Sequence, residues 1–423
     1  MKKQLKGHLL LIGDELLSGR IADANGQVMA KLFREAGILL TGITTIPDQV
    51  DIMKKEFQDK WAENDVIITS GGIGPTRDDL TKEVLADAFG KKIIPRDDVA
   101  ASVTDNYLRF GREWTPTLNQ YHHFPEDFLV LRNGKGLAPG LAYLNQGKLI
   151  CALPGVPREL AVMMEEEVLP LIAKNLAKSE TKDYGLTCRT FGIPEERIFN
   201  QLVPDLWDRL LKVGSVASYP QIIGVDIVVS MHGTDQDRDR AYDEMKKIIL
   251  STPLAPHIWQ WGNTPLPEFV LECARQKKIT IALAESCTGG LTASRLTDVS
   301  GSSQTFLGSM VCYANEVKQK VLGVTSETLE KHGAVSEECA REMVLGLKKN
   351  LGADLNISFT GIAGPTGGSV EKPVGTVCFG VSYGDKIFTE KHLFPGDRVR
   401  LKQRFSEYGL LLMLKAMEII YSH

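Results

Sequence analysis

Several classes of protein are excluded by what this 423-residue sequence lacks. No apolar run is long enough for a membrane-spanning helix, and the first one is cut short by Asp14-Glu15, so neither a membrane protein nor a secretory signal is expected. Basic residues are not in excess: the net charge of −4 and the pI near 6.1 argue against a nucleic-acid partner or an anionic membrane surface. The seven cysteines form no C-x-x-C pair, which favours reduced, buried thiols over disulfides or a zinc site. We therefore expect a cytoplasmic protein.

The composition that remains is that of an ordinary globular protein, with 43 % hydrophobic and 24 % charged residues. A chain of this length is too long for one hydrophobic core. The sequence pattern divides it into residues 1–173, a small α+β connector at 174–256, and a C-terminal domain at 263–423.

The first segment alternates apolar strands with helical patterns. Three strands are predicted at Leu9–Ile12, Asp65–Thr69 and Leu149–Leu153, and helices are predicted to begin near Asp23, Asp48 and Asp78. This order is typical of an α/β domain with a mostly parallel sheet, and such sheets bind ligands at the carboxyl ends of their strands.

The loop Ser70–Asp79 follows one of these strands. Its glycines offer backbone N–H groups for a phosphate, and Asp78 and Asp79 offer two carboxylates for a metal, which together suit a nucleotide diphosphate. The alternative is structural, because acids are also favoured in the first turn of a helix by the helix dipole.

The stretch Ile279–Leu296 is predicted to form a strand, a tight turn and a helix, with Ser286 at the corner. A hydroxyl there lies beside free N–H groups that can stabilise an oxyanion, so Ser286 is a candidate nucleophile. Alternatively, Ser286 is only a helix cap and its glycines only close the turn. Because no G-x-S-x-G elbow or histidine triad pattern is present, a lysine or tyrosine is the more economical base. We interpret the neighbouring Cys287 as a core residue.

Three motifs of the C-terminal segment resemble the nicotinamide-nucleotide amidohydrolase (deamidase) domain of the CinA family. They are Ala284-Glu285-Ser286-Cys287-Thr288-Gly289-Gly290, Tyr313–Lys318 and Thr360-Gly361-Ile362-Ala363-Gly364-Pro365. The resemblance implies an α/β sandwich that hydrolyses nicotinamide mononucleotide to nicotinic acid mononucleotide and ammonia, in pyridine nucleotide salvage, without a cofactor. Ser286 would attack the amide carbon, while Lys318 with Tyr313 would take and return the proton.

The same resemblance implies the groups that bind the substrate. The oxyanion would be held by N–H groups at Thr288, Gly289 and Gly290. The 5′-phosphate would be bound by the loop containing Thr360, Gly361, Ala363 and Gly364, with positive charge from Arg398 and Lys402.

The first segment resembles the molybdopterin-binding-like domain that opens CinA-family proteins, on its Gly13–Arg20 segment, the Ser70–Asp79 loop, Ala138–Gly140 and Leu153–Glu159. What this implies is an ADP-ribose pyrophosphatase that depends on a divalent metal ion, bound only in this domain. The metal would be held by Asp14, Asp78, Asp79 and Glu159, and phosphates would face Gly71, Gly72 and Gly74. The chain departs from the family at Ala24 and at Tyr121-His122-His123, which we expect at the pocket. The adjacent histidines could be metal ligands, although a solvated pair is the commoner arrangement.

Two other classes of function stay open. The first domain alone could make the chain a molybdopterin or nucleotide transferase, or the whole chain could be a non-catalytic scaffold that binds nucleotides. No basic patch supports a role in handling DNA. Because exposed edge strands can pair between copies, we expect a homodimer.

Overall fold

The computed structural model describes residues 4–76, 78–176 and 181–420, and the chain forms two compact units. The first unit runs to Tyr184 and takes in Met231–Arg240, and the second comprises Gly185–Ser230 and the chain from Ala241 onward. Most of the predicted connector is thus part of the same compact unit as the C-terminal domain. None of the helices in the described ranges is both long and apolar enough to cross a membrane.

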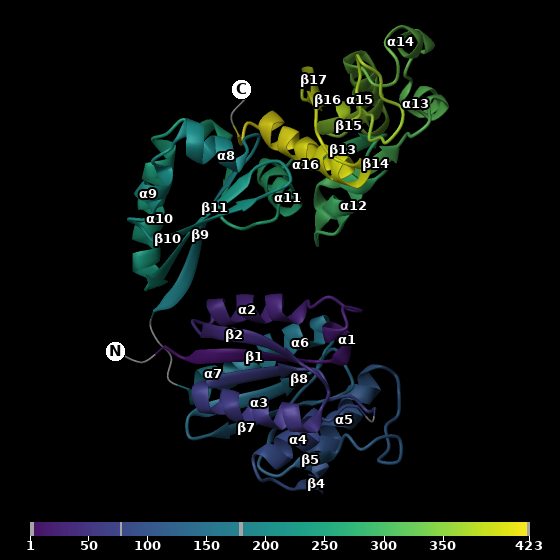
Figure 1. The fold of residues 1–423 in the computed structure, drawn as a ribbon. Coiled ribbons are helices and arrows are strands. Elements are labelled where there is room, and N and C mark those ends of the chain that lie inside the picture. Colours follow the sequence, from purple (N-terminus) through teal and green to yellow (C-terminus); the bar gives the residue numbers. More distant parts are fainter. Residues whose placement is uncertain (1–3, 77, 177–180, 421–423) are drawn as a thin grey trace. The chain divides into compact units, whose positions relative to one another are not determined.

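A six-stranded sheet forms the centre of the first unit, in the order β2-β1-β3-β8-β7-β6 (Figure 1). The strands are β1 (Lys6–Ile12), β2 (Leu39–Ile46), β3 (Val66–Ser70), β6 (Leu129–Leu131), β7 (Gly140–Asn145) and β8 (Lys148–Leu153). The first four in the spatial order are parallel, whereas β7 and β6 run antiparallel to their neighbours. The predicted α/β domain with a mostly parallel sheet is confirmed. A separate pair, β4 (Ile93–Pro95) and β5 (His123–Pro125), lies outside this sheet.

Helices cover both faces of the six-stranded sheet because its central strands are apolar on both sides. Along β1, Leu9 and Leu11 belong to one hydrophobic cluster, while Leu10 and Ile12 belong to the other. The first cluster includes residues of α2 (Asn25–Glu35), α6 (Pro157–Met163), a π-helical turn (Met164–Val168) and α7 (Leu169–Asn175). The second includes residues of α3 (Val50–Glu63), α4 (Thr81–Ala88) and α5 (Asp97–Arg109). A short helix, α1 (Asp14–Leu17), follows β1 directly.

A four-stranded sheet in the order β10-β11-β9-β12 is built from the middle of the chain. Its strands are β9 (Lys182–Thr190), β10 (Ser215–Pro220), β11 (Val225–Gly233) and β12 (Ile258–Trp261), with short helices α8 (Glu195–Arg197) and α9 (Leu206–Leu210) and the long helix α10 (Asp235–Leu250). The sequence pattern ends the connector at residue 256, but β12 lies beyond that point and pairs antiparallel with β9. The middle sheet therefore extends past the predicted end of the connector.

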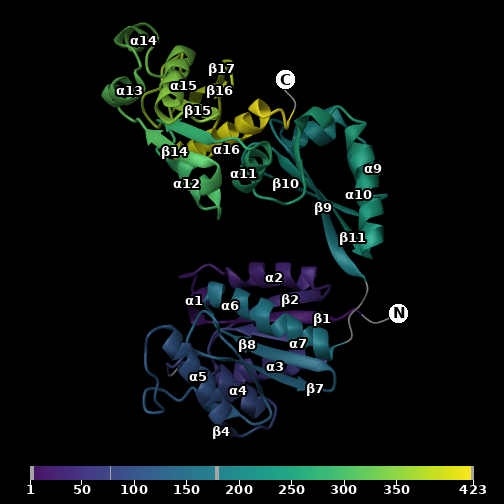
Figure 2. The same ribbon diagram turned by 180° about the vertical axis from the view of Figure 1, so that it is seen from behind.

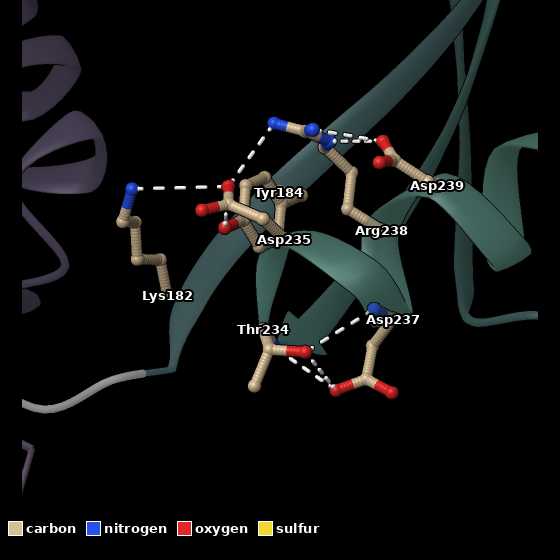
Figure 3. Close-up of polar contacts among 7 residues, drawn as sticks. All are labelled: Lys182, Tyr184, Thr234, Asp235, Asp237, Arg238 and Asp239. Atoms are coloured by element: carbon tan, nitrogen blue, oxygen red, sulfur yellow. Dashed lines mark hydrogen bonds and ion pairs between the residues drawn. The ribbon is translucent and has the colours of Figure 1, made fainter.

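The start of α10 is fixed by side chains around Thr234 (Figure 3). The Thr234 hydroxyl accepts a hydrogen bond of 3.2 Å from the Asp237 N–H, and the Asp237 carboxylate accepts one of 2.9 Å from the Thr234 N–H. This reciprocal cap satisfies N–H groups that the first helical turn leaves unpaired. Next to it, Asp235 accepts a hydrogen bond of 2.8 Å from the Tyr184 hydroxyl on β9.

The C-terminal domain is a five-stranded sheet between two helical layers, which confirms the predicted α/β sandwich (Figures 1 and 2). The spatial order is β14 (Phe306–Val311), β13 (Ile281–Glu285), β15 (Leu355–Gly361), β16 (Thr376–Tyr383) and β17 (Lys386–Leu393). The first three are parallel, and the last two form an antiparallel pair. One helical layer contains α11 (Leu266–Lys277), α12 (Leu291–Thr297) and α16 (Arg398–Ala416), and the other contains α13 (Asn315–Leu322), α14 (Ser326–Lys331) and α15 (Glu337–Leu351).

Candidate active sites in the two units

The three C-terminal motifs meet because each follows the carboxyl end of one of three adjacent parallel strands. Ser286 follows β13, Tyr313 follows β14, and the loop beginning at Ile362 follows β15. Backbone hydrogen bonds continue the pairing beyond the strands: Ser286 N–H donates to Phe359 at 3.0 Å, and Cys312 N–H donates to Glu285 at 2.8 Å. This is the edge of a parallel sheet at which ligands bind.

Glu285, and not Ser286, caps the helix at the corner. Its fully buried carboxylate accepts hydrogen bonds from the N–H groups of Gly290, Thr292 and Ala293, at 3.1, 3.1 and 2.8 Å. The structural alternative for Ser286, that its side chain is only a helix cap, is therefore wrong. This cap was missed from the sequence, where the only hint of it was a charged residue at the end of an apolar strand.

All three N–H groups expected to hold the oxyanion have acceptors within the protein. Gly289 N–H donates to the Ser286 carbonyl at 3.1 Å, and Gly290 N–H donates to the Glu285 carboxylate. The Thr288 N–H donates to the Cys287 thiol. In the part of the chain that the structure describes, the buried Thr288 hydroxyl has no partner, so it is the spare donor of this turn.

Lys318 lies on α13 with only 2 % of its surface exposed, and its Nζ donates a hydrogen bond of 2.9 Å to the Tyr313 carbonyl. Burial lowers the pKa of Lys318, because desolvation disfavours the charged amine. Three thiols nearby favour the charged form in principle, those of Cys287, Cys312 and Cys339. Burial raises the pKa of each thiol, to about 12 for Cys287 and about 11 for Cys339, so all three are uncharged at neutral pH. Cys287 belongs to the hydrophobic core, as predicted.

Tyr313 contacts the lysine through its backbone and an arginine through its hydroxyl. The side chain is 60 % exposed, and its hydroxyl accepts a hydrogen bond of 3.0 Å from Arg398 Nη2. Arg398 Nη1 donates to the Gly364 carbonyl at 2.7 Å. Arg398, at the start of α16, therefore ties the Tyr313 segment to the loop after β15.

The hydroxyl of the predicted phosphate loop has a partner within the protein. Thr360 is buried, and its hydroxyl donates a hydrogen bond of 2.5 Å to the Ala334 carbonyl. Ala363 is also buried, whereas Gly364 has a φ of +72°, which favours glycine. The second predicted cation lies at the Ser286 corner: a Cβ built on Gly289 would lie 3.7 Å from Lys402 Nζ.

A cavity of about 830 Å³ lies at the carboxyl ends of the parallel strands of the first unit. Predicted residues that line it are Gly71, Gly72, Gly74, Asp78, Asp79 and Glu159, together with both departures expected at a pocket, Ala24 and Tyr121. Asp14 is not among the lining residues, and its N–H donates a hydrogen bond of 3.1 Å to the Asp48 carboxylate. Arg77, in the same loop as Asp78, lies outside the described residues.

The carboxylates of this cavity have partners of their own. Asp79 accepts hydrogen bonds from the Thr76 N–H and hydroxyl at 2.8 and 2.5 Å, and Glu159 accepts one of 2.7 Å from Asn133 Nδ2. No three His, Cys, Asp or Glu side chains in the described ranges lie close enough together to hold a metal ion. Magnesium in phosphate enzymes commonly uses one or two carboxylates plus substrate phosphates, and these acids fit that mode. The metal set therefore stays a prediction.

Two polar residues at this cavity were missed from the sequence. Burial raises the pKa of Asp48, and the negative charges of Asp14, Glu15 and Asp78 raise it further. Asn25 donates its amide hydrogens to Ser70 Oγ at 2.8 Å and to the Gly155 carbonyl at 2.7 Å, which leaves its buried Oδ1 without a partner. Both residues stand at or before a helix start, where Asp and Asn usually act only as caps, so no separate signal marks them in the sequence.

The histidine pair is neither of the two arrangements considered from the sequence. The rings of His122 and His123 meet edge to face at 4.5 Å, and the His122 ring lies 5.4 Å from the Trp114 ring. Both side chains are half-buried, and burial lowers the pKa of His122. The pair forms an aromatic cluster with Trp114.

Comparison with known proteins covers both units. Residues 263–417 match the family described as "CinA C-terminal domain", and residues 8–174 match the "Probable molybdopterin binding domain". A Bacillus subtilis protein named "Putative competence-damage inducible protein" is 36 % identical over 98 % of each chain, and a "CinA-like protein" of Chloroherpeton thalassium is 36 % identical over 96 % of this chain and 97 % of its own.

Among solved structures, a CinA superfamily protein from Klebsiella pneumoniae is 32 % identical, covering 36 % of this chain and 96 % of its own with a TM-score of 0.35. A CinA protein of unknown function from Thermoplasma acidophilum is 25 % identical, covering 41 % of this chain and 99 % of its own with a TM-score of 0.37. Because the relatives are 36 % identical over nearly the whole of each chain, the chain belongs to the CinA family. It has an N-terminal molybdopterin-binding-like domain and a CinA C-terminal domain.

Proposed function

We propose that the C-terminal domain is an amidohydrolase that converts nicotinamide mononucleotide to nicotinic acid mononucleotide and ammonia. The observation that carries this proposal is Lys318, a buried amine with a lowered pKa that lies within electrostatic range of Cys287, the residue after Ser286. A neutral lysine is a general base that can activate a serine hydroxyl without a histidine. The cations Arg398 and Lys402 suit a substrate that carries a phosphate.

In the proposed mechanism, Lys318 takes the proton of the Ser286 hydroxyl as its oxygen attacks the carboxamide carbon. The tetrahedral oxyanion receives a hydrogen bond from the spare hydroxyl of Thr288. Lys318 then protonates the departing nitrogen, the C–N bond breaks, and ammonia leaves an ester on Ser286. Water, deprotonated by the same amine, hydrolyses that ester to the carboxylate and restores the serine.

We propose metal-dependent ADP-ribose pyrophosphatase activity for the first unit. It is supported by a cavity of nucleotide size that combines the glycine loop with Asp78, Asp79 and Glu159. A bound divalent ion would neutralise charge on the diphosphate. Glu159 is held by Asn133, and Asn25 Oδ1 offers an acceptor to a substrate hydroxyl or amine.

The test is an end-point assay of the purified chain with each substrate, with and without a chelator. Ammonia release from nicotinamide mononucleotide should resist the chelator, and AMP release from ADP-ribose should not. Loss of ammonia release with chelator would contradict the serine mechanism. Absence of AMP would indicate that Ala24 and Tyr121, which stand at the cavity, have altered the substrate of the first unit.

A further inference from the structure

Helix α16 carries a buried polar contact that the proposed chemistry does not use. Arg295, on α12, donates from Nη1 to the Ser406 hydroxyl at 2.9 Å and from Nη2 to the Glu407 carboxylate. Ser406 is fully buried, and the side chains of Arg295 and Glu407 are only 23 % and 17 % exposed. A guanidinium that donates from two nitrogens fixes the orientation of its partners more strictly than a single ion pair does.

The two helices joined by this contact carry different parts of the proposed deamidase site. Helix α12 begins directly after Gly290, so its start is the Ser286 corner. Helix α16 carries Lys402, whose Nζ would lie 3.7 Å from a Cβ on Gly289 at that corner. Glu407 stands about one turn after Lys402 on α16, and Arg295 lies in the second turn of α12. The contact therefore fixes the position of Lys402 relative to the Ser286 corner.

The surroundings of the contact favour a geometric role over a stabilising one. Ion pairs with this degree of burial contribute little net stability, because desolvation offsets most of the attraction. Asp226 on β11 adds a second negative charge within electrostatic range of Glu407. Hydrophobic packing of α11, α12 and α16 in one cluster already holds the layer together.

We propose that Arg295, through Ser406 and Glu407, is a positioning residue of the deamidase that holds Lys402, the cation proposed for the phosphate of the substrate, in its place near Gly289. This inference rests on the proposed function of the C-terminal domain. It predicts that Arg295 matters only for substrates that carry a phosphate, and only while Lys402 is present.

The experiment is a double-mutant cycle of Arg295→Met, Lys402→Met and the double variant, assayed with nicotinamide mononucleotide and with nicotinamide riboside, which has the same carboxamide but no phosphate. Arg295→Met should raise KM for the mononucleotide by roughly 3- to 10-fold with little change in kcat, and should leave the riboside unaffected. In the Lys402→Met background, Arg295→Met should add nothing further. Glu407→Gln should reproduce the effect of Arg295→Met.

Glu327→Gln is the matched control, because it removes a carboxylate from the exposed ion pair with Lys331 on α14 and should change neither constant. Thermal unfolding of each variant separates misfolding from misplacement, and Arg295→Lys, which keeps the charge, should restore part of the loss. The inference would be overturned if the KM increases caused by Arg295→Met and Lys402→Met multiplied in the double variant. An equal loss with the riboside would also overturn it.

If the wild type releases no ammonia, the proposed function fails instead. Calorimetric binding of inorganic phosphate to the same variants then tests the positioning role, which requires weaker binding in Arg295→Met only when Lys402 is present.

Discussion

Lys318 Nζ donates its 2.9 Å hydrogen bond to the backbone carbonyl of Tyr313, a neutral acceptor. The contact orients the amine but brings no opposite charge, so it does not offset the desolvation that lowers the pKa of Lys318. An ion pair with a carboxylate at the same place would have kept the lysine charged. The pairing with a carbonyl is what makes this lysine suitable as a base.

The deamidase rate should rise with pH through the lowered pKa of Lys318 and then level off. Only the neutral amine accepts the serine proton, so the charged form that dominates below this pKa is inactive. The measurement is kcat/KM for nicotinamide mononucleotide between about pH 5 and pH 10, below the ordinary lysine pKa near 10.4. A rate that falls across this range would mean that the essential group acts as an acid.

Lys318→Met should also change how stability depends on pH. Since the pKa of Lys318 is lower in the folded protein, the unfolded chain binds more protons between that value and about 10.4, and wild-type stability gains a contribution that rises with pH across this window. The variant should lack this contribution and be at least as stable at neutral pH. Urea unfolding at pH 7 and pH 9.5 measures both effects. A variant that is less stable at pH 7 and keeps the wild-type slope would contradict the burial argument.

Tyr313→Phe should be milder than any change to Lys318. It removes the hydroxyl that accepts from Arg398, but the contact with Lys318 is made by the backbone and survives. We expect a raised KM and a kcat within a few-fold of wild type, by steady-state assay. Tyr219→Phe, at an exposed tyrosine of β10, is the control. A kcat loss as large as that of Lys318→Met would instead make the phenol a direct participant in proton transfer.

Gly136→Ala should silence the first unit while leaving the second intact. A Cβ at Gly136 would lie 1.9 Å from Glu159 Oε2, so the carboxylate must move out of its place at the cavity. AMP release from ADP-ribose should fall by about 10-fold or more, because small misplacements of a site group are costly. Gly134→Ala is the control, since its nearest neighbour would be 3.6 Å away. Unchanged AMP release by Gly136→Ala would show that the position of Glu159 is immaterial.

Much of the fold follows from local sequence patterns. Helix α13 and strand β17 are examples, because each shows one clear periodicity between turn residues. Strand β2 was missed: it lies at the edge of its sheet, most of its residues are only partly buried, and its sequence Leu-Leu-Thr-Gly-Ile-Thr-Thr-Ile has no continuous apolar run. Strand β12 was missed because four residues after a proline-containing segment resemble a linker.

The residues of the candidate sites likewise divide into those that short motifs predict and those that they do not. Ser286, Lys318 and the glycine loops were accessible from short motifs. The cap formed by Glu285 was not accessible in this way, because it depends on the hydrogen bond that its carboxylate accepts from the Ala293 N–H in the following helix. Likewise, the orphaned acceptor of Asn25 arises from contacts with Ser70 and Gly155, which are distant in sequence. Long-range hydrogen bonds of this kind have no local signature.

The role of Lys318 as the base for a serine nucleophile is tested by the initial rate of ammonia release from nicotinamide mononucleotide by Lys318→Met. Lys320→Met is the matched control, because Lys320 is exposed on the same helix. Lys318→Met should lose roughly two to four orders of magnitude in kcat, the usual contribution of general acid–base catalysis, while Lys320→Met keeps the wild-type rate. A folded Lys318→Met protein with a rate within a few-fold of wild type would contradict this role.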